Sequence, residues 1–319
     1  MKTQEVPRIH LTGAFTALVT PFTEKGEVDE PALRKLVRRQ VAGGVAGVVP
    51  GGTTGEAVTL EPDEHERVVA VTVEEARAAR RPIRVIAGCG SNDTRRSQKL
   101  AERCRRAGAD ALLVVTPYYN KPTPRGLIEH FRAVADAGHL PVVAYNVPAR
   151  TGVNMLPETV LQLAEDSRTC AVKEASGNLD QACEILRHRP AGFSVLSGED
   201  SLALPMIACG ADGVIAVVSN EAPALLVAPA EAALDDGDID RGTEAEHIDD
   251  HDDAGKRGQG SQSGLAPIES CIERFLAVNR GHCDSYRDAP ASLFAILNAG
   301  ASRFVRSLSS ISQAWSCAW

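Results

Sequence analysis

Residues 111–146 read ALLVVTPYYNKPTPRGLIEHFRAVADAGHLPVVAYN. An apolar run rich in β-formers at 111–117 is followed by a helical pattern at 125–138 and by a second apolar run at 142–146. This order is typical of two parallel strands joined by a helix, because helices cover a parallel sheet and its strands are apolar on both faces. The stretch therefore predicts one βα unit and the strand that follows it.

The same alternation extends from about residue 14 to residue 219. Eight βα units in this length favour an α/β fold of the closed (β/α)8 TIM-barrel type over a doubly wound sheet, and no phosphate-binding G-x-G-x-x-G motif follows the first strand. Asp29 and Pro157 are suited to the first turns of two helices. We predict strands at 15–22, 47–52, 84–90, 111–117, 142–146, 170–175, 194–199 and 213–219, and helices at 29–44, 62–79, 94–107, 125–138, 157–166, 178–188 and 201–210.

The composition of the 319 residues is that of an ordinary globular protein, with 44% hydrophobic and 24% charged residues. No apolar run reaches the roughly 18 residues that cross a bilayer, and the first residues lack the apolar stretch of a signal peptide. We therefore expect a cytoplasmic protein with no membrane partner. A formal charge of -8 argues against a nucleic-acid partner, because phosphate binding needs clustered cations. The eight cysteines include no Cys-x-x-Cys pair, so reduced thiols are expected.

The character of the chain changes after the predicted barrel, which covers residues 1–238. Residues 239–264 are polar and carry too few apolar groups to order themselves, so they are expected to form a disordered linker. Residues 265–319 form an atypical C-terminal segment that ends in both tryptophans. A shifted reading frame or a divergent tail would each account for this change. The acidic cluster at 246–253 is better explained as a solvated loop than as a metal site.

A lysine lies inside the apolar strand predicted at 170–175, which reads CAVKEA. Burial disfavours a charged ammonium, and an amine whose pKa falls from about 10.4 toward neutrality is a nucleophile that can form an imine with a ketone. Alternatively, Lys173 pairs with Glu174 at the strand end. The chain has only seven lysines, and Lys173 is the only one in a strand of this pattern, which favours the functional interpretation.

Three further loops at the carboxyl ends of predicted strands, where barrel active sites form, carry candidate side chains. Residues 51–56 read GGTTGE, where glycines allow close approach of the backbone and N–H groups and hydroxyls can hold a carboxylate. Residues 116–122 read TPYYNKP and residues 145–152 read YNVPARTG. Tyr145 could move protons, and Arg150 could bind a carboxylate in bidentate fashion. Taken singly, these features have simpler explanations. A glycine-rich turn most often has no further role, a loop tyrosine is usually a packing residue, and a loop arginine is usually solvated.

Together, the segments GTTGE, TPYYNKP, YNVPARTG and KEASGN, in this order and spacing, resemble dihydrodipicolinate synthase, a family of the pyruvate-dependent class I aldolases and lyases. The resemblance extends from about Gly13 to about Asp238. It implies a lyase of lysine and diaminopimelate biosynthesis that condenses pyruvate with L-aspartate 4-semialdehyde to give 4-hydroxy-tetrahydrodipicolinate. Thr53, Thr54 and the 145–152 loop favour the synthase over sialic acid lyases and keto-sugar aldolases.

The resemblance also implies catalytic roles for four residues. Lys173 would form the imine with pyruvate, and Tyr145 would relay protons. Thr53 would link Tyr145 to Tyr119, which would reach into the site of a neighbouring subunit. The active form would then be a homo-oligomer, either a dimer or a tetramer.

Four further residues would bind the substrates. Thr54 would hold the pyruvate carboxylate, Arg150 would receive the carboxylate of the semialdehyde, and the backbones of Gly198 and Ile215 would line the pocket. The resemblance implies no metal or organic cofactor, because the lysine itself is the electron sink.

One expectation concerns inhibition by lysine. Lysine-inhibited members of the family bind this amino acid through a histidine and a carboxylate, at whose positions the present chain has Pro62 and Arg96. His65, Asn92 and Tyr118 do match that site. Because an arginine would repel the ammonium of lysine, we predict insensitivity to lysine.

Two other functions stay open on the sequence. Another pyruvate-dependent aldolase would act on a 2-keto sugar acid, which Arg150 and Thr53 argue against. A non-catalytic barrel that binds 2-keto acids would result if the altered tail prevented assembly. The presence of Lys173, Tyr145 and Thr53 argues against a loss of the chemistry itself.

Overall fold

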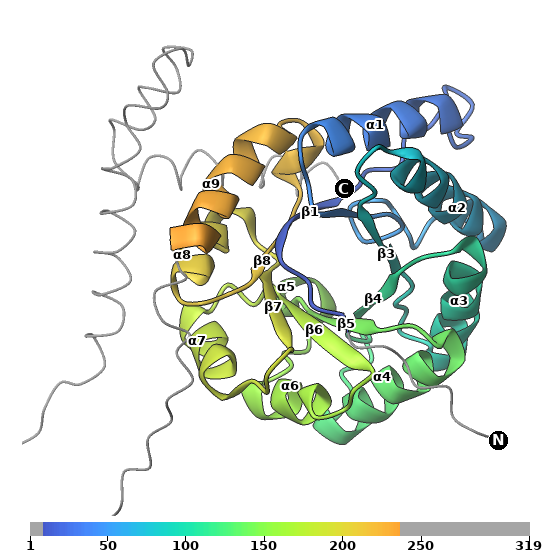
Figure 1. Cartoon of the computed structure of the whole chain (residues 1–319). Helices are drawn as coiled ribbons and strands as arrows, with labels where there is room; N and C mark the ends of the chain where they lie inside the picture. Colours follow the sequence, from blue (N-terminus) through green and yellow to red (C-terminus); the bar gives the residue numbers. More distant parts are fainter. Residues whose placement is uncertain (1–8, 237–319) are drawn as a thin grey trace, which may run out of the picture.

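The computed structural model describes residues 9–236, and within them eight parallel strands close into a barrel. Each strand pairs with the next one in sequence, and the last strand pairs with the first. Figure 1 shows the strands as an inner ring with the helices around them. The predicted barrel is confirmed, and the doubly wound alternative is excluded. The strands are β1 (Gly13–Ala17), β2 (Gly47–Val49), β3 (Arg84–Gly88), β4 (Ala111–Val115), β5 (Val142–Asn146), β6 (Thr169–Glu174), β7 (Ser194–Ser197) and β8 (Gly213–Ala216).

The helices cover the outside of this barrel. Asp29 caps the first helix by accepting a hydrogen bond from the Ala32 backbone N–H at 2.9 Å, and Pro157 starts a later helix, as predicted. The last helix contacts β1, so it completes the outer ring. The helices are α1 (Glu30–Ala42), α2 (Pro62–Ala78), α3 (Thr94–Ala107), α4 (Pro124–Gly138), α5 (Pro148–Thr151), α6 (Pro157–Ala164), α7 (Leu179–His188), α8 (Ala203–Ala208) and α9 (Pro223–Asp236), with 3-10 turns η1 (Asp200–Leu202) and η2 (Val218–Asn220).

Several local features differ from the predicted ones, including the ends of β2 at Val49 and of β8 at Ala216, each three residues before the predicted end. β1 ends five residues before the predicted end at residue 22, because the groups that follow Leu18 bind segments outside the sheet: the Val19 N–H donates to the Asn220 side chain, and the Thr20 hydroxyl donates to the Gly55 carbonyl. The helix predicted at 201–210 is divided into η1 and α8. The short helix α5 was not predicted, since four residues give no periodic pattern.

Two apolar layers, one inside the barrel and one between the strands and the helices, explain why the strands read as apolar runs. Successive strand residues face opposite sides, so Val142 and Ala144 pack against the helices while Val143 and Tyr145 lie in the interior. Both faces of β5 are therefore buried. A polar side chain on either face needs a partner or a function.

Several predicted features fall on residues that the structure does not describe. The linker at 239–264, the segment at 265–319 and the acidic cluster at 246–253 all lie outside the described residues. Within residues 9–236, no group of three or more His, Cys, Asp or Glu side chains is placed to hold a metal. Over the same range, none of the helices has both the length and the apolar character needed to cross a membrane.

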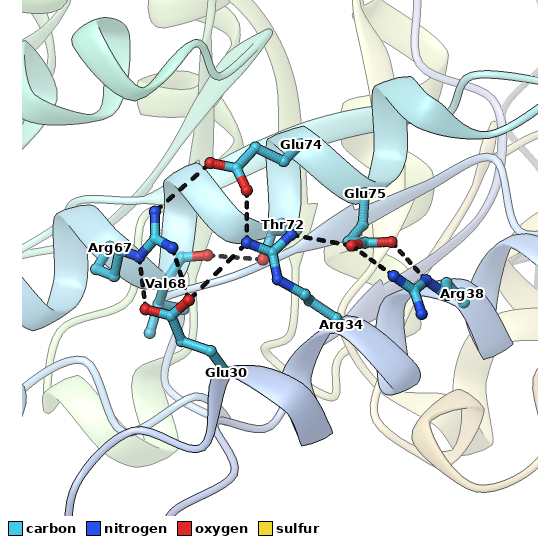
Figure 2. A network of polar contacts seen from close by, with 8 residues as sticks. All are labelled: Glu30, Arg34, Arg38, Arg67, Val68, Thr72, Glu74 and Glu75. Atoms are coloured by element: carbon cyan, nitrogen blue, oxygen red, sulfur yellow. Dashed lines mark hydrogen bonds and ion pairs between the residues drawn. The ribbon is translucent and has the colours of Figure 1, made fainter.

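Ion pairs join α1 to α2 on the outer surface of the barrel (Figure 2). Arg34 lies 2.6 Å from Glu74 and 2.9 Å from Glu75, and Arg38 lies 2.6 Å from Glu75. The hydrogen bond from Arg38, and then that from Arg34, lower the pKa of the Glu75 carboxyl. Glu75 is 10% exposed and Glu74 is 50% exposed, so solvent screens the Glu75 pairs less.

Replacing Glu75 by glutamine is expected to lower the free energy of unfolding by about 1 kcal/mol, because two arginines lose their charged partner. The matched variant Glu74→Gln should cost less than about 0.5 kcal/mol. Since the pKa of Glu75 is lowered in the folded state, its contribution is complete above the ordinary carboxyl pKa and is lost as the pH falls. Urea unfolding at neutral and acid pH measures both effects. Equal losses in the two variants at neutral pH would contradict this account.

Candidate active site

Lys173 and Tyr145 lie side by side at the carboxyl ends of adjacent strands. Lys173 belongs to β6 and Tyr145 to β5, and the two residues are register partners in the sheet. The Lys173 Nζ lies 4.3 Å from the centroid of the Tyr145 ring. The two residues are only 4% and 6% exposed. The structure thus brings a buried amine and a buried phenol together at the end of the barrel where active sites of this fold form.

Burial lowers the pKa of Lys173 to about 8, because the ammonium loses its hydration inside the protein. Asp200 and Glu199 oppose this effect by favouring the charged form, and Arg150 supports it. With a pKa of about 8, roughly one Lys173 amine in ten is neutral at pH 7, compared with fewer than about one in a thousand for an ordinary lysine. A nucleophilic amine is therefore available near neutral pH.

Glu174 follows Lys173 in sequence but faces α7 on the other side of the sheet, since strand residues alternate. Its carboxylate accepts hydrogen bonds from the side-chain amides of Asn146 and Gln181, both at 3.1 Å, and from the Ser176 backbone N–H at 2.7 Å. No ion pair between Lys173 and Glu174 occurs within residues 9–236. The alternative interpretation, in which Lys173 pairs with Glu174, is therefore wrong.

Burial raises the pKa of Tyr145 to about 12, because a phenolate would be poorly hydrated in the barrel. Arg150 opposes the shift by favouring the phenolate. The Tyr145 hydroxyl therefore stays protonated near neutral pH. A protonated phenol beside an amine can pass a proton to and from a reaction intermediate.

Gly198, just after β7, lies against the side chain of Lys173. A Cβ atom at position 198 would come within 2.9 Å of Lys173 Cε and 2.7 Å of Ala175 Cβ, closer than real Cβ contacts allow. A glycine is therefore needed beside the lysine. Ile215 on β8 is fully buried in the same interior cluster as Tyr145. Gly198 thus borders the Lys173 side chain, and Ile215 lies in the barrel interior.

The turn after β2 presents Thr53 and Thr54 at the same end of the barrel. Thr53 is exposed and Thr54 is half-buried. The N–H groups of Gly55 and Glu56 donate to the carbonyl groups of Gly52 and Thr53 inside the turn, both at 3.1 Å. The described residues contain no hydrogen bond from the Thr53 hydroxyl to Tyr145.

Tyr119 and Arg150 are exposed at this end of the barrel. The Tyr119 side chain is 87% exposed, while its backbone N–H donates to the Thr151 carbonyl at 3.0 Å. Arg150 lies on α5, and its charge lowers the pKa of both Lys173 and Tyr145. Arg150 is thus within electrostatic reach of the buried pair, whereas the Tyr119 ring is largely free of its own chain.

Residues 10–248 match the sequence profile of the dihydrodipicolinate synthetase family. The chain belongs to this family. It is 50% identical over 212 residues to the 4-hydroxy-tetrahydrodipicolinate synthase of Syntrophus aciditrophicus, covering 66% of this chain and 72% of the relative. It is 51% identical over 211 residues to that of Geobacter sulfurreducens, covering 66% and 71%. The crystal structure of the dihydrodipicolinate synthase from Aquifex aeolicus is 44% identical, with a TM-score of 0.68 over 71% of this chain and 76% of that one.

Two acidic residues near Lys173, Asp200 and Glu199, were not predicted from the sequence. Asp200 is 4% exposed, and it accepts hydrogen bonds from the backbone N–H groups of Val217 at 3.0 Å and Val218 at 2.9 Å. Burial raises the pKa of Asp200 and of Glu199. Asp200 therefore ties the end of β7 to the segment after β8 and places negative charge near Lys173. Its position three residues after the end of β7, where active sites of this fold form, is the signal that could have indicated it.

An amide network behind Lys173, buried except at Asn154, was also not predicted. The Asn146 amide donates to the Asn154 side chain at 2.8 Å as well as to Glu174, and the Asn154 amide donates to Gln181 at 2.8 Å. The network joins β5, β6 and α7 on the outer face of the sheet. Asn146 and Glu174 are polar residues in apolar strands, and this contrast could have indicated the network.

A small pocket lies next to the turn that follows β2. Its lining includes His65, Arg96 and Tyr118, three of the residues considered for lysine binding. Pro62 and Asn92 are not among the lining residues. Arg96 thus lines the same pocket as His65 and Tyr118, two of the residues that match the lysine site of the family.

Proposed function

We propose that this chain condenses pyruvate with L-aspartate 4-semialdehyde through an imine on Lys173 and releases 4-hydroxy-tetrahydrodipicolinate. The observation that carries the proposal is the buried Lys173 amine, with its pKa of about 8, beside the Tyr145 phenol. The shared name of the relatives, 4-hydroxy-tetrahydrodipicolinate synthase, supports the same reaction.

The chemistry follows from a neutral amine in a protected site. The Lys173 amine attacks the ketone carbon of pyruvate, and loss of water gives an imine. A proton then leaves the pyruvate methyl group, and the resulting enamine attacks the aldehyde carbon of the semialdehyde. The amino group of the semialdehyde part attacks the imine carbon and displaces Lys173, which closes the ring. Tyr145 would supply and collect protons in these steps.

The surrounding residues would bind the two substrates. Thr54 would hold the pyruvate carboxylate, and the backbones of Gly198 and Ile215 would line the pocket. Arg150 would receive the carboxylate of the semialdehyde. Two observations support this role: Arg150 is exposed, and its charge acts on the pKa of Lys173.

Thr53 and Tyr119 would extend the proton relay from Tyr145. The 87% exposure of Tyr119 supports a place for this ring in the site of a neighbouring subunit, because an aromatic side chain gains little from facing water. The active form would then be at least a homodimer.

Borohydride reduction in the presence of pyruvate tests the proposal. A reduced pyruvyl adduct is expected on Lys173, which would block trypsin there and give the peptide 169–187 in place of 169–173. Adduct formation should become faster as the pH rises toward about 8, because deprotonation produces the nucleophile. Aspartate semialdehyde added before the borohydride should discharge the adduct. If only sugar aldehydes that yield 2-keto sugar acids discharged the adduct, the other aldolase would be favoured. A folded sample without any adduct would refute the imine.

We further propose that lysine does not inhibit this enzyme. Arg96 lines the pocket together with His65 and Tyr118, and a guanidinium there repels the ammonium of lysine. Initial rates of condensation should be unchanged by millimolar lysine. Inhibition to half the rate at such concentrations would show that the pocket tolerates the cation.

A further inference from the structure

Cys183 and Cys209 are partly exposed, unlike the other cysteines that the structure describes. Cys89, Cys104 and Cys170 are all buried. Cys183 lies on α7, and Cys209 is the residue that caps the carboxyl end of α8. α7 and α8 are neighbours in the outer ring (Figure 1) and are in contact. Two partly exposed cysteines therefore lie on, or directly after, adjacent helices that belong to consecutive βα units.

The two thiols also contact each other. The Cys209 side chain forms a hydrogen bond with Cys183, and Arg187 places a positive charge nearby on α7. The hydrogen bond, followed by this charge, lowers the pKa of Cys183 to about 7, although burial and Asp180 act in the opposite direction. Burial instead raises the pKa of Cys104 to about 12. Among the described cysteines, Cys183 is therefore the strongest candidate for a thiolate nucleophile, because its pKa is lowered and it is partly exposed.

We propose that Cys183 and Cys209 form a reversible disulfide that joins α7 to α8. The oxidant is a low-molecular-weight disulfide such as oxidised glutathione. The Cys183 thiolate attacks one sulfur of the oxidant, which forms a mixed disulfide and releases one small thiol. Cys209 then loses its proton and attacks the Cys183 sulfur, which releases the second small thiol. Two protein thiols are oxidised, and one small disulfide is reduced to two thiols.

The position of the bond gives it a structural effect. The chain between the two cysteines contains β7, Gly198 and Asp200, so the disulfide closes a covalent loop around this βα unit. α8 has only six residues and gains a covalent tether to the longer helix α7. Because a cross-link restricts the unfolded chain, the midpoint of thermal unfolding is expected to rise by roughly 5 °C on oxidation.

Peptide mapping of the full-length protein tests the proposal. The folded protein is incubated with oxidised glutathione, its free thiols are blocked with N-ethylmaleimide, and it is digested with trypsin without reductant. Cys183 lies on the tryptic peptide 174–187 and Cys209 on 188–241, since Arg189 precedes a proline and is not cleaved. The expected product is these two peptides joined, with two hydrogens fewer than their sum, and it should disappear after reduction. Cys170, alone on 169–173, is the internal control and should stay unmodified by glutathione.

Variants separate the pair from other thiols of the chain. Cys183→Ser and Cys209→Ser should each lose both the joined peptides and the rise in the unfolding midpoint, while the reduced variants keep their condensation activity. If Cys183→Ser fails to fold, Cys183→Ala takes its place. The peptide mapping of the unmodified protein tests the proposal without any variant. A glutathione adduct on Cys183 without the joined peptides, free thiols at both positions after oxidation, or joining only in unfolded protein would each overturn the proposal.

Discussion

Replacing Lys173 by arginine is expected to lower the rate of condensation by more than about 10³-fold and to abolish the borohydride-trapped adduct. Arginine keeps the positive charge, but its guanidinium stays protonated and cannot attack a ketone. The loss should therefore appear in kcat and in the trapping experiment together. Steady-state kinetics and mass spectrometry of the reduced protein measure both quantities.

The matched control is Lys99→Arg, since Lys99 is exposed on α3, away from the buried pair. This variant should keep its rate and its adduct. Circular dichroism of both variants shows whether the barrel is intact. A pyruvyl adduct on another lysine of a folded Lys173→Arg protein would show that the nucleophile has been misassigned.

Replacing Tyr145 by phenylalanine is expected to lower kcat by about 10²- to 10⁴-fold, because the site loses the group proposed to move protons. The ring that packs against Lys173 is kept, so the pyruvate adduct should still be trapped, although more slowly. Tyr145 is buried and stays protonated up to a pKa of about 12, so the loss should not depend on pH between about 6 and 9. Rapid-mixing trapping separates imine formation from the later steps.

Tyr118→Phe is the control, because Tyr118 lines the small pocket outside the barrel interior. Its rate should stay within about threefold of that of the unmodified enzyme. If Tyr145→Phe also stayed within this range, proton transfer would have to be assigned to another group or to water.

The strands could be predicted from the sequence, but several of their ends could not. Each strand is an apolar run because helices cover one face and the interior covers the other. β1, however, ends near Ala17 partly because Asn220 binds the N–H of Val19, and these two residues are 201 positions apart. No pattern within a short window of sequence encodes such a contact.

The buried lysine could be predicted because Lys173 interrupts an apolar strand. Strand alternation alone would have separated it from Glu174, whose partners Asn146 and Gln181 lie on the outer face of the sheet. Asp200 was missed because its role depends on two backbone N–H groups that follow a different strand. The roles proposed for Thr53 and Tyr119 would depend on a second subunit, and the sequence of one chain indicates such a subunit only through its family.

During synthesis, β1 cannot pair with β8 until β8 has been translated, so closure of the barrel is delayed. The Thr12 hydroxyl, next to β1, donates to the carbonyl of Asp212, next to β8, and these residues are 200 positions apart. At about 5–20 residues per second, roughly 10–40 s pass on the ribosome between the two strands. During this interval one edge of β1 has no partner strand, and unpaired edges can bind other chains. The rate of translation therefore determines how long a nascent chain is exposed to aggregation with its neighbours on the same messenger RNA.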